Sequence, residues 1–255
     1  MTAAVSIQNL SFAYEKDPVI SHMDLTLSTG TVTAVLGANG VGKTTLLHLL
    51  LGLFEPDSGE ICFFDRPVHK YSQTQLKQLI GMVSQNDTPP FDLRVDEYVL
   101  LGRAPHLGLL TIPGDSDRAA AAAALSTVGM THMDGHAVTR LSSGEKQLVN
   151  MARSLAQEPD ILLLDEPCSH LDLINSRQML VLMKTIAEQG RTVVFTTHDP
   201  NAAAAVADQV LLMKKGELVA AGTVTQTLTR ALLTRTYGGD VEVIETVRGP
   251  VVRAV

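Results

Sequence analysis

A glycine-rich stretch that ends in a lysine and two threonines has the spacing of a phosphate-binding loop. Residues 37–45 read Gly-Ala-Asn-Gly-Val-Gly-Lys-Thr-Thr: a glycine, four residues, a second glycine, lysine and threonine. The glycines let the backbone turn tightly and direct N–H groups at an anion, and the following helix adds a positive dipole end. The residues expected to contact a nucleotide are Gly37, Asn39, Gly40, Gly42, Lys43, Thr44 and Thr45.

Lys43 and Thr44 have separate chemical tasks in such a loop. The lysine supplies a positive charge for the β and γ phosphates, and the threonine hydroxyl is a ligand suited to Mg²⁺. Residues 31–36 are predicted to form a buried strand before the loop, and residues 45–51 a helix after it. A glycine-rich turn without function would also join a strand to a helix, but the Lys43–Thr44 pair favours a phosphate site.

Two adjacent carboxylates follow a continuous apolar run. Residues 161–164 read Ile-Leu-Leu-Leu, which is typical of a central parallel strand, and Asp165 and Glu166 follow directly. Open α/β sheets bind ligands at the carboxyl ends of their strands. Asp165 is suited to hold Mg²⁺ through its water shell, and Glu166 to polarise an attacking water. A capping pair in a loop is the alternative, and the phosphate loop upstream disfavours it.

Three further residues have an ordinary interpretation as well as a functional one. Tyr14, at the end of a strand, is either a stacking platform for adenine or a half-buried strand tyrosine. Gln85 follows a strand and either reaches Mg²⁺ or the attacking water, or is a loop glutamine. His198 also follows a strand and either binds a γ-phosphate or is structural. Considered one at a time, the ordinary interpretations are favoured.

The stretch Leu141–Gln147 predicts a capped helix start. Ser142 is the expected N-cap, and Glu145 three residues later completes a capping box. A helix start rich in serine and glycine, here with Gly144, exposes backbone N–H groups to an anion. In isolation, a well-capped helix without a ligand is the more common case.

Composition excludes several classes of protein. The chain has 255 residues, 45% of them hydrophobic, and a net charge of −7, which argues against a nucleic-acid partner. The cysteines, Cys62 and Cys168, are far apart, and with no secretory signal at Met1 we expect a reducing cytosol. No apolar run approaches the ~20 residues of a membrane span, so membrane association is expected through a partner.

The order of the predicted elements gives an α/β fold. Residues 5–27 are expected to form antiparallel strands, and residues 86–157 an inserted helical subdomain with a helix over 119–128 capped by Ser116 and Asp117. A last helix is predicted over 226–236. After Gly239 the sequence fits either a small appended strand or a loose tail. We therefore expect an ATPase domain over residues 1–240 and a C-terminal tail over 241–255.

Taken together and in this order, the motifs resemble those of the ATP-binding subunit of an ABC transporter over essentially the whole chain. Residues 37–45 match the Walker A loop, 141–145 the signature, 161–166 Walker B, and 169–172 the D-loop. The resemblance favours the functional interpretations of Tyr14, Gln85, Ser142 and His198. It implies a P-loop NTPase core with a mostly parallel sheet, an N-terminal antiparallel subdomain and an inserted helical subdomain.

The resemblance also implies roles and partners. Catalytic roles fall to Glu166, His198 and Gln85, and Mg²⁺ ligation to Thr44, Gln85 and Asp165. The other nucleotide contacts implied are those of Tyr14, Ser142, Gly144 and Asp165 with ATP. The implied partners are a second copy in a head-to-tail homodimer, transmembrane permease subunits and, indirectly, a substrate-binding protein. The implied location is peripheral, on the cytoplasmic face of the inner membrane.

The cargo is indicated only by two fragments. Residues 101–108 and 197–201 resemble ATPases of iron-siderophore, haem and cobalamin importers, with importers of a molybdate-type oxyanion or a metal ion as alternatives. A non-transport ABC ATPase or another P-loop enzyme, such as a small-molecule kinase, is a further alternative. Ser143 and His170 depart from the family pattern, which commonly has glycine and a small residue there. We expect the permease to dock near Gln85–His106, with Arg103 at the contact.

Overall fold

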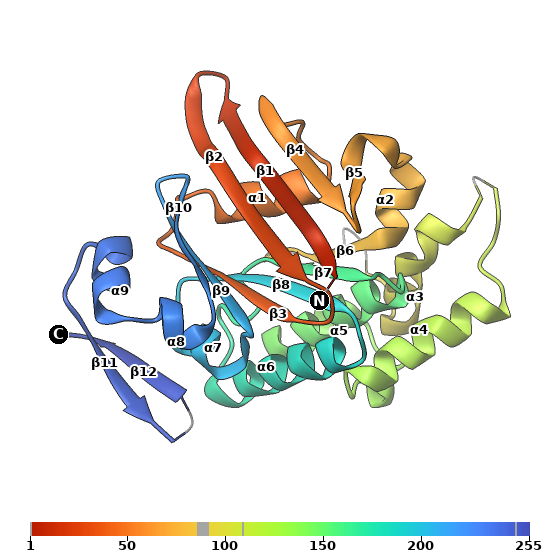
Figure 1. Cartoon of the computed structure of the whole chain (residues 1–255). Coiled ribbons are helices and arrows are strands. Elements are labelled where there is room, and N and C mark those ends of the chain that lie inside the picture. The colour runs from red at the N-terminus through yellow and green to blue at the C-terminus, as the bar shows by residue number, and fades with distance from the viewer. Residues whose placement is uncertain (1, 86–91, 109, 248) are drawn as a thin grey trace.

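A mostly parallel sheet lies at the centre of the computed structural model, which describes residues 2–85, 92–108, 110–247 and 249–255 (Figure 1). Among these residues the sheet has six strands, in the order β10 (Glu217–Gly222), β9 (Gln209–Lys214), β3 (Val32–Leu36), β8 (Thr192–Thr197), β7 (Ile161–Leu164) and β6 (Ile80–Val83). Only the β9–β10 pair in this sheet is antiparallel. Strands β3, β7 and β8 are buried along their whole length, and the predicted fold class is confirmed.

A second, antiparallel sheet covers one face of the first. Its strands follow the order β2 (Asp17–Ser28), β1 (Ala3–Tyr14), β4 (Ser58–Phe63) and β5 (Arg66–Pro67), which confirms the predicted N-terminal antiparallel pair. Helix α1 (Lys43–Leu50) packs its leucines with apolar side chains from both sheets in one hydrophobic cluster. This packing fixes the helix whose first residue is Lys43.

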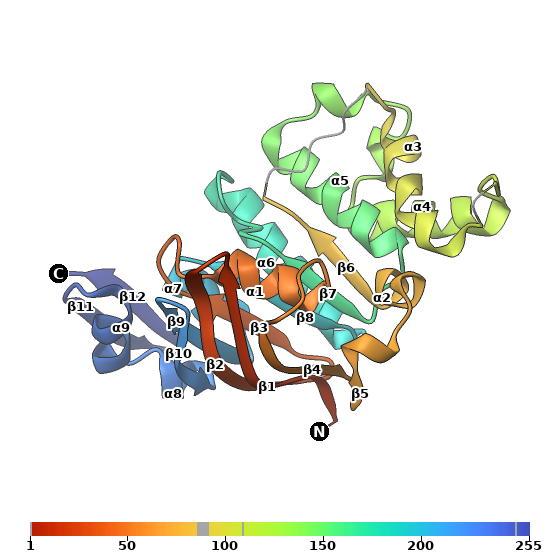
Figure 2. The ribbon, with the colours of Figure 1, turned by 90° about the horizontal axis from the view of Figure 1, so that it is seen from above.

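Helices cover the other face of the central sheet and form a group beside it. Helices α5 (Ser143–Ala156), α6 (Leu173–Glu188) and α7 (Pro200–Val206) share a second hydrophobic cluster with β3, β7 and β8. Figure 2 shows α3 (Val95–Leu100), α4 (Asp115–Thr127) and α5 together beyond β6, on the side away from the C-terminus. The remaining short helices before α5 are α2 (Gln73–Leu79) and the 3₁₀ turns Val68–Lys70, Leu101–His106, Thr131–Met133 and Val138–Arg140.

Two predicted helix boundaries are wrong. Helix α4 begins earlier than predicted, and its N-cap is Gly114, not Ser116. Asp117 does take part in capping, because its Oδ2 accepts from the Gly114 N–H at 3.0 Å. The single helix predicted over 226–236 is instead two, α8 (Val224–Thr227) and α9 (Arg230–Tyr237). The chain breaks between them because Thr229 caps α9, its hydroxyl accepting from Leu232 N at 3.4 Å.

The C-terminal residues form a two-stranded hairpin, where the sequence predicted either a small appended strand or a loose tail. Strands β11 (Val241–Thr246) and β12 (Gly249–Ala254) pair antiparallel along their length. Val241 and Val252 are buried in the same hydrophobic cluster as the central sheet. The views in Figures 1 and 2 both place this hairpin beside α7 and α9.

The structure contradicts the expected role of Arg103 as a surface contact. The side chain is 9% exposed, and it forms ion pairs with Asp117 at 3.0 Å and Glu158 at 2.6 Å. It also donates to the Ala156 carbonyl oxygen at 2.7 Å. Arg103 therefore joins its own 3₁₀ turn to the start of α4 and the end of α5, and is not displayed to a partner. None of the described helices has the length and apolar character of a membrane span.

Candidate nucleotide-binding site

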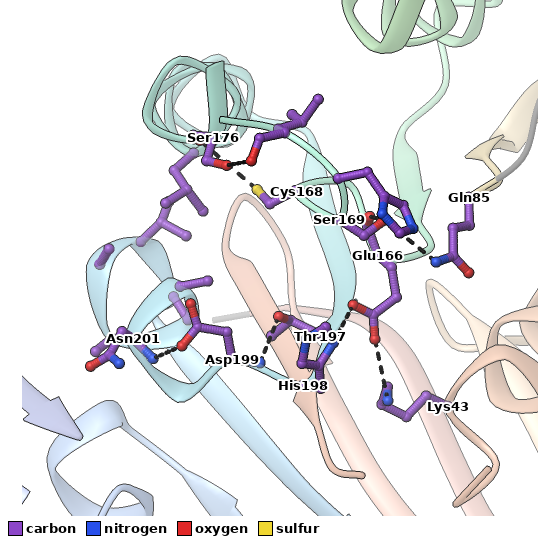
Figure 3. Close-up of a pocket in the computed structure, with 18 of the residues that line it drawn as sticks. Lys43, Gln85, Glu166, Cys168, Ser169, Ser176, Thr197, His198, Asp199 and Asn201 are labelled. Carbon is purple, nitrogen blue, oxygen red and sulfur yellow. Dashed lines mark hydrogen bonds and ion pairs between the residues drawn. The ribbon is translucent and has the colours of Figure 1, made fainter. Parts of the chain in front are cut away.

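A cleft of about 1710 Å³ lies at the carboxyl ends of the central strands and continues between α6 and α7 (Figure 3). In Figure 3, Lys43, Glu166 and His198 converge on one part of it, and Gln85 lies beside Ser169. The predicted site residues that line the cleft are Tyr14, Asn39, Gly40, Gly42, Lys43, Thr44, Thr45, Gln85, Glu166 and His198. The fold thus brings together side chains that are far apart in the sequence.

The phosphate-binding loop joins the end of β3 to the start of α1, as predicted. Gly42 is the N-cap of α1 with φ of 101°, and Gly40 has φ of 78°, conformations that favour glycine. A Cβ at Gly37 would lie 2.5 Å from the Met213 carbonyl oxygen, too close for a side chain. These glycines set the path of the loop, and the helix that follows begins at Lys43.

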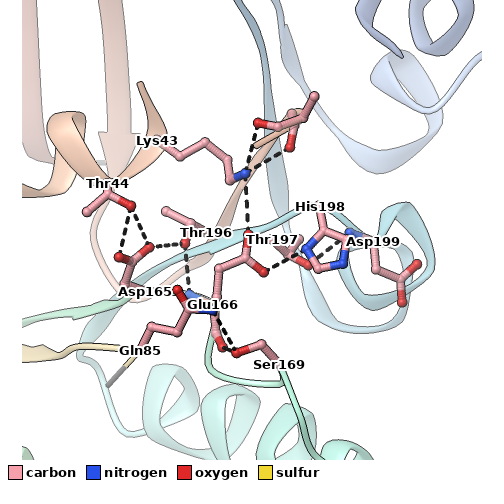
Figure 4. Close-up of polar contacts among 12 residues, drawn as sticks. Lys43, Thr44, Gln85, Asp165, Glu166, Ser169, Thr196, Thr197, His198 and Asp199 are labelled. Atoms are coloured by element: carbon pink, nitrogen blue, oxygen red, sulfur yellow. Dashed lines mark hydrogen bonds and ion pairs between the residues drawn. The ribbon is translucent and has the colours of Figure 1, made fainter. Parts of the chain in front are cut away.

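The Lys43 ammonium is held among three oxygen atoms (Figure 4). It donates to the carbonyl oxygens of Gly37 at 2.9 Å and Ala38 at 3.2 Å, and it pairs with Glu166 Oε1 at 3.3 Å. The lysine side chain is 6% exposed, so water screens this pair poorly. An incoming phosphate would have to compete with the Glu166 carboxylate for the ammonium.

Asp165 is buried below the cleft and accepts hydrogen bonds from two threonine hydroxyls. Thr44 Oγ1 lies 2.9 Å from Asp165 Oδ2 and 3.2 Å from Oδ1, and Thr196 Oγ1 donates to Oδ1 at 2.6 Å. Thr196 also accepts from the Glu166 N–H at 2.9 Å, so it touches both carboxylate residues. Thr196 could not be identified as a site residue from the sequence, because a threonine near the end of a buried strand carries no functional signal of its own.

Glu166 holds its carboxylate between two cationic or ionisable side chains. Its Oε1 pairs with Lys43, and its Oε2 lies 2.9 Å from His198 Nδ1 (Figure 4). Glu166 has φ of 49°, a left-handed conformation that is strained for a residue with a side chain. Its carbonyl oxygen accepts from the Ser169 N–H at 3.0 Å and hydroxyl at 2.8 Å, which fixes this turn. Both carboxylate oxygens therefore point into the cleft with defined partners.

Gln85 lies after the end of β6 and lines the cleft. In the described part of the chain, its side-chain amide is paired with Ser169 Oγ at 3.5 Å, a long contact, and not with Thr44 or Asp165. The structure thus places Gln85 in the same cleft as the other predicted residues.

Tyr14 lies near Thr45, where the phosphate loop joins α1, and 45% of its surface is exposed. Its ring makes edge-to-face contacts with Phe12 and Phe54, with centroids 5.0 and 5.6 Å apart, and its hydroxyl lies 3.4 Å from Thr45 Oγ1. A half-exposed aromatic ring of this kind suits stacking on a base. Phe54 was not identified from the sequence, since its contact with Tyr14 depends on how the chain returns after α1.

Ser142 and Gly144 lie apart from this cleft. Ser142 caps α5 as predicted, accepting from Glu145 N at 3.3 Å, and the hydrogen bond from its side chain holds the pKa of Glu145 below its ordinary value. Gly144 packs against the side chain of Asn175 near the start of α6. Among the described residues that line the cleft, neither Ser142 nor Gly144 occurs. At the start of α5, Ser142 and Ser143 are exposed, whereas Gly144 is buried.

Cys168, which also lines the cleft, is poorly suited to act as a nucleophile. Burial, with a smaller contribution from the neighbouring carboxylates Asp199 and Glu166, raises the pKa of its thiol to about 12. Only the thiolate is a good nucleophile, so at neutral pH this side chain is an inert part of the wall.

Comparison with known proteins identifies relatives along nearly the whole chain. Residues 20–169 match the family model described as "ABC transporter". The molybdate import ATP-binding protein MolC of Haemophilus influenzae is 39% identical over 217 residues, covering 84% of this chain and 81% of MolC. The ferric enterobactin transport ATP-binding protein FepC of Escherichia coli is 34% identical, covering 91% and 86%. A solved chain from an inward-facing ABC transporter, described as of metal-chelate type, superposes with a TM-score of 0.87 at 35% identity, covering 100% and 97%.

Proposed function

The chain belongs to the ABC transporter family as an ATP-hydrolysing subunit of an importer, and we propose that the cargo of this importer is a metal chelate. The metal-chelate type of the superposed transporter and the relation to FepC support this cargo. The similarity to MolC favours a molybdate-type oxyanion as the second candidate. The cargo does not contact an ATPase subunit in this scheme, so its residues do not select between the two.

The observation that carries the catalytic proposal is the convergence of Lys43, Thr44, Glu166 and His198 in one cleft, with Asp165 directly below it and hydrogen-bonded to Thr44. We propose that Lys43 binds the β and γ phosphates of ATP, assisted by the backbone N–H groups of the phosphate loop. Glu166 then accepts a proton from the attacking water, and His198 holds the second carboxylate oxygen so that the first faces the water.

The donor set beside the loop fits Mg²⁺. Thr44 and Asp165 present hard oxygen ligands next to each other, with Thr44 Oγ1 2.9 Å from Asp165 Oδ2. We propose that these two residues, with Gln85, hold the ion beside the nucleotide. The bound ion would neutralise charge on the phosphate oxygens. Thr196 keeps Asp165 oriented through its 2.6 Å hydrogen bond.

We propose that ATP binding frees Glu166 to act as a base, because a phosphate replaces the Glu166 carboxylate as the partner of the Lys43 ammonium. When a phosphate draws the ammonium away, Glu166 loses its ion-pair partner at Oε1 and keeps His198 at Oε2. The carboxylate then has a free oxygen for water at the point where the γ-phosphate lies. This order of events makes hydrolysis depend on nucleotide binding without any motion of the sheet.

We further propose a head-to-tail homodimer in which Ser142 and Gly144 of one subunit complete the site of the other. The separation of the start of α5 from the subunit's own cleft supports this arrangement. A negative phosphate between Lys43 and the positive end of a partner's helix would hold the two subunits together. The region 86–157 would then act as a helical subdomain that carries the signature and meets the permease.

A mixing experiment tests this dimer. Lys43→Ala disables both sites of a homodimer, and Ser142→Arg does the same from the signature side. In a heterodimer of the two variants, one site carries both defects and the other is intact, so a non-hydrolysable ATP analogue should occupy one site per dimer. If the motifs acted within one chain, every site would carry one defect and no analogue would be retained. Ser126→Arg, an exposed serine on α4, is the matched control and should retain both sites.

A reconstitution experiment tests the cargo and location. We propose that the subunit docks on the cytoplasmic face of the inner membrane through permease subunits, with a substrate-binding protein delivering the cargo. Co-purified permease and ATPase in vesicles should take up a ferric siderophore or haem on addition of ATP, and should not take up molybdate. Uptake of molybdate alone would overturn the metal-chelate proposal. ATP hydrolysis without an added acceptor separates this ATPase from a small-molecule kinase.

A further inference from the structure

The loop that carries His198 has contacts on two sides. The His198 side chain faces Glu166, and the backbone is attached to the C-terminal part of the chain. Residues 198–199 connect β8 to α7, and α7 packs against β12 of the C-terminal hairpin (Figure 1). Tyr237, the last residue of α9, donates its hydroxyl to the His198 carbonyl oxygen at 3.0 Å. We propose that Tyr237 and Asn201 are positioning residues that hold His198 against Glu166, and that the C-terminal hairpin is the support for this contact.

The geometry at Tyr237 suits a permanent hydrogen-bond donor. Burial raises the pKa of its hydroxyl above the ordinary value, with the charges of Asp199 and Glu166 acting in the same direction. The phenol therefore stays protonated wherever the ATPase works, and its hydrogen bond fixes the carbonyl group of His198. The peptide orientation at His198 sets where the imidazole points, and Nδ1 lies 2.9 Å from Glu166 Oε2.

Asn201 attaches the same loop to the hairpin by a pair of hydrogen bonds. Its Nδ2 donates to the Val252 carbonyl oxygen at 2.9 Å, and its Oδ1 accepts from the Val252 N–H at 2.8 Å. Val252 itself is 8% exposed and belongs to the hydrophobic cluster under the central sheet. Asp199 caps α7 by accepting from Asn201 N at 2.8 Å, which ties the attachment to the residue next to His198.

These contacts explain why a hairpin outside the nucleotide cleft bears on the reaction. The exposed imidazole of His198 has 58% of its side-chain surface in solvent, so packing around the ring itself does little to fix it. Two attachments behind the loop, from α9 and β12, restrict the backbone instead. A small displacement of a positioned group costs rate at the chemical step while leaving phosphate binding by Lys43 unchanged.

The test compares two tyrosines that each donate to a backbone carbonyl. Tyr237→Phe removes the hydroxyl behind His198, and Tyr71→Phe removes a matched one, which donates to the Phe63 carbonyl oxygen at 2.9 Å away from the cleft. In the full chain with ATP and Mg²⁺, Tyr237→Phe should lower kcat by about 2- to 12-fold, the range for one neutral hydrogen bond, with KM unchanged. Tyr71→Phe should leave kcat and KM as they are.

If Tyr237 only stabilised the fold, its replacement would not change the NMR resonances of the His198 imidazole. The imidazole resonances, assigned by their loss in His198→Ala, should shift in Tyr237→Phe and in Asn201→Asp, which cannot donate to Val252. They should not shift in Tyr71→Phe. A wild-type kcat together with unshifted resonances in Tyr237→Phe would overturn the proposal, as would an equal loss of kcat in Tyr71→Phe.

This inference rests on the proposed role of His198 in hydrolysis. The same measurements distinguish a failure of that role from a failure of the positioning by Tyr237 and Asn201. His198→Ala with wild-type turnover would refute the role of His198 itself. Low turnover in His198→Ala with normal turnover in Tyr237→Phe would leave that role intact and refute only the positioning by the C-terminal elements.

Discussion

Replacing Glu166 by glutamine separates proton transfer from nucleotide binding with almost no change in shape. The amide cannot accept a proton from water, and loss of a positioned general base costs ~10²- to 10⁴-fold in rate, or ~2.7–5.4 kcal/mol in activation free energy. The same change removes the negative charge that lies 3.3 Å from Lys43. Since a hydrogen bond to a charged group contributes a net ~1.5–3 kcal/mol and the amide retains part of it, ATP binding should strengthen by about fivefold or more.

The assay for Glu166→Gln has two parts. Phosphate release under saturating ATP and Mg²⁺ gives turnover, and equilibrium titration with ATP in the absence of Mg²⁺ gives the dissociation constant. Glu188→Gln is the matched control, because Glu188 lines the same cleft at the far end of α6 and should leave both quantities unchanged. Turnover within about threefold of the wild type would refute the assignment of Glu166 as the base, given the usual size of this effect. Weaker ATP binding would refute the competition between Glu166 and phosphate for Lys43.

Two other substitutions test the adenine site and the buried arginine. Tyr14→Ala should weaken ATP binding by about 5- to 150-fold, the range for loss of one base-stacking contact, whereas Tyr14→Phe keeps the ring and should retain affinity in the same titration. Arg103→Glu should lower the free energy of unfolding by about 3–5 kcal/mol and the melting temperature by about 6–20 °C, because it leaves the buried carboxylate of Asp117 without its partner. The exposed Arg118→Glu on the same helix as Asp117 is its control in thermal unfolding, and equal melting temperatures for the two variants would contradict this role.

Features of the site that depend on neighbouring residues could be predicted from the sequence. The capping box of Ser142 and Glu145, the glycines of the phosphate loop and the cap formed by Asp199 before Pro200 all lie within a few residues of one another. Their chemistry is set by the local backbone, so residue type and spacing suffice.

Features that depend on which strands are neighbours could not be predicted. Thr196 reaches Asp165 only because β8 pairs with β7 in parallel, and the sequence shows it as one more residue of an apolar strand. Arg103 looked like a surface residue because its partners Asp117 and Glu158 are 14 and 55 residues away along the chain. The break at Thr229 was missed for a different reason, since a capping threonine inside a helical pattern also occurs as an ordinary helix residue.

The two carboxylate oxygens of Glu166 have partners of different origin. Oε1 is held by Lys43, whose position comes from the phosphate loop and responds to nucleotide. Oε2 is held by His198, whose loop is attached to α9 and β12. ATP binding would release the first oxygen, while the second stays fixed only as long as the C-terminal attachment is intact. Hydrolysis then requires both conditions at one carboxylate, so a variant that weakens only the C-terminal attachment should bind ATP normally and turn it over more slowly.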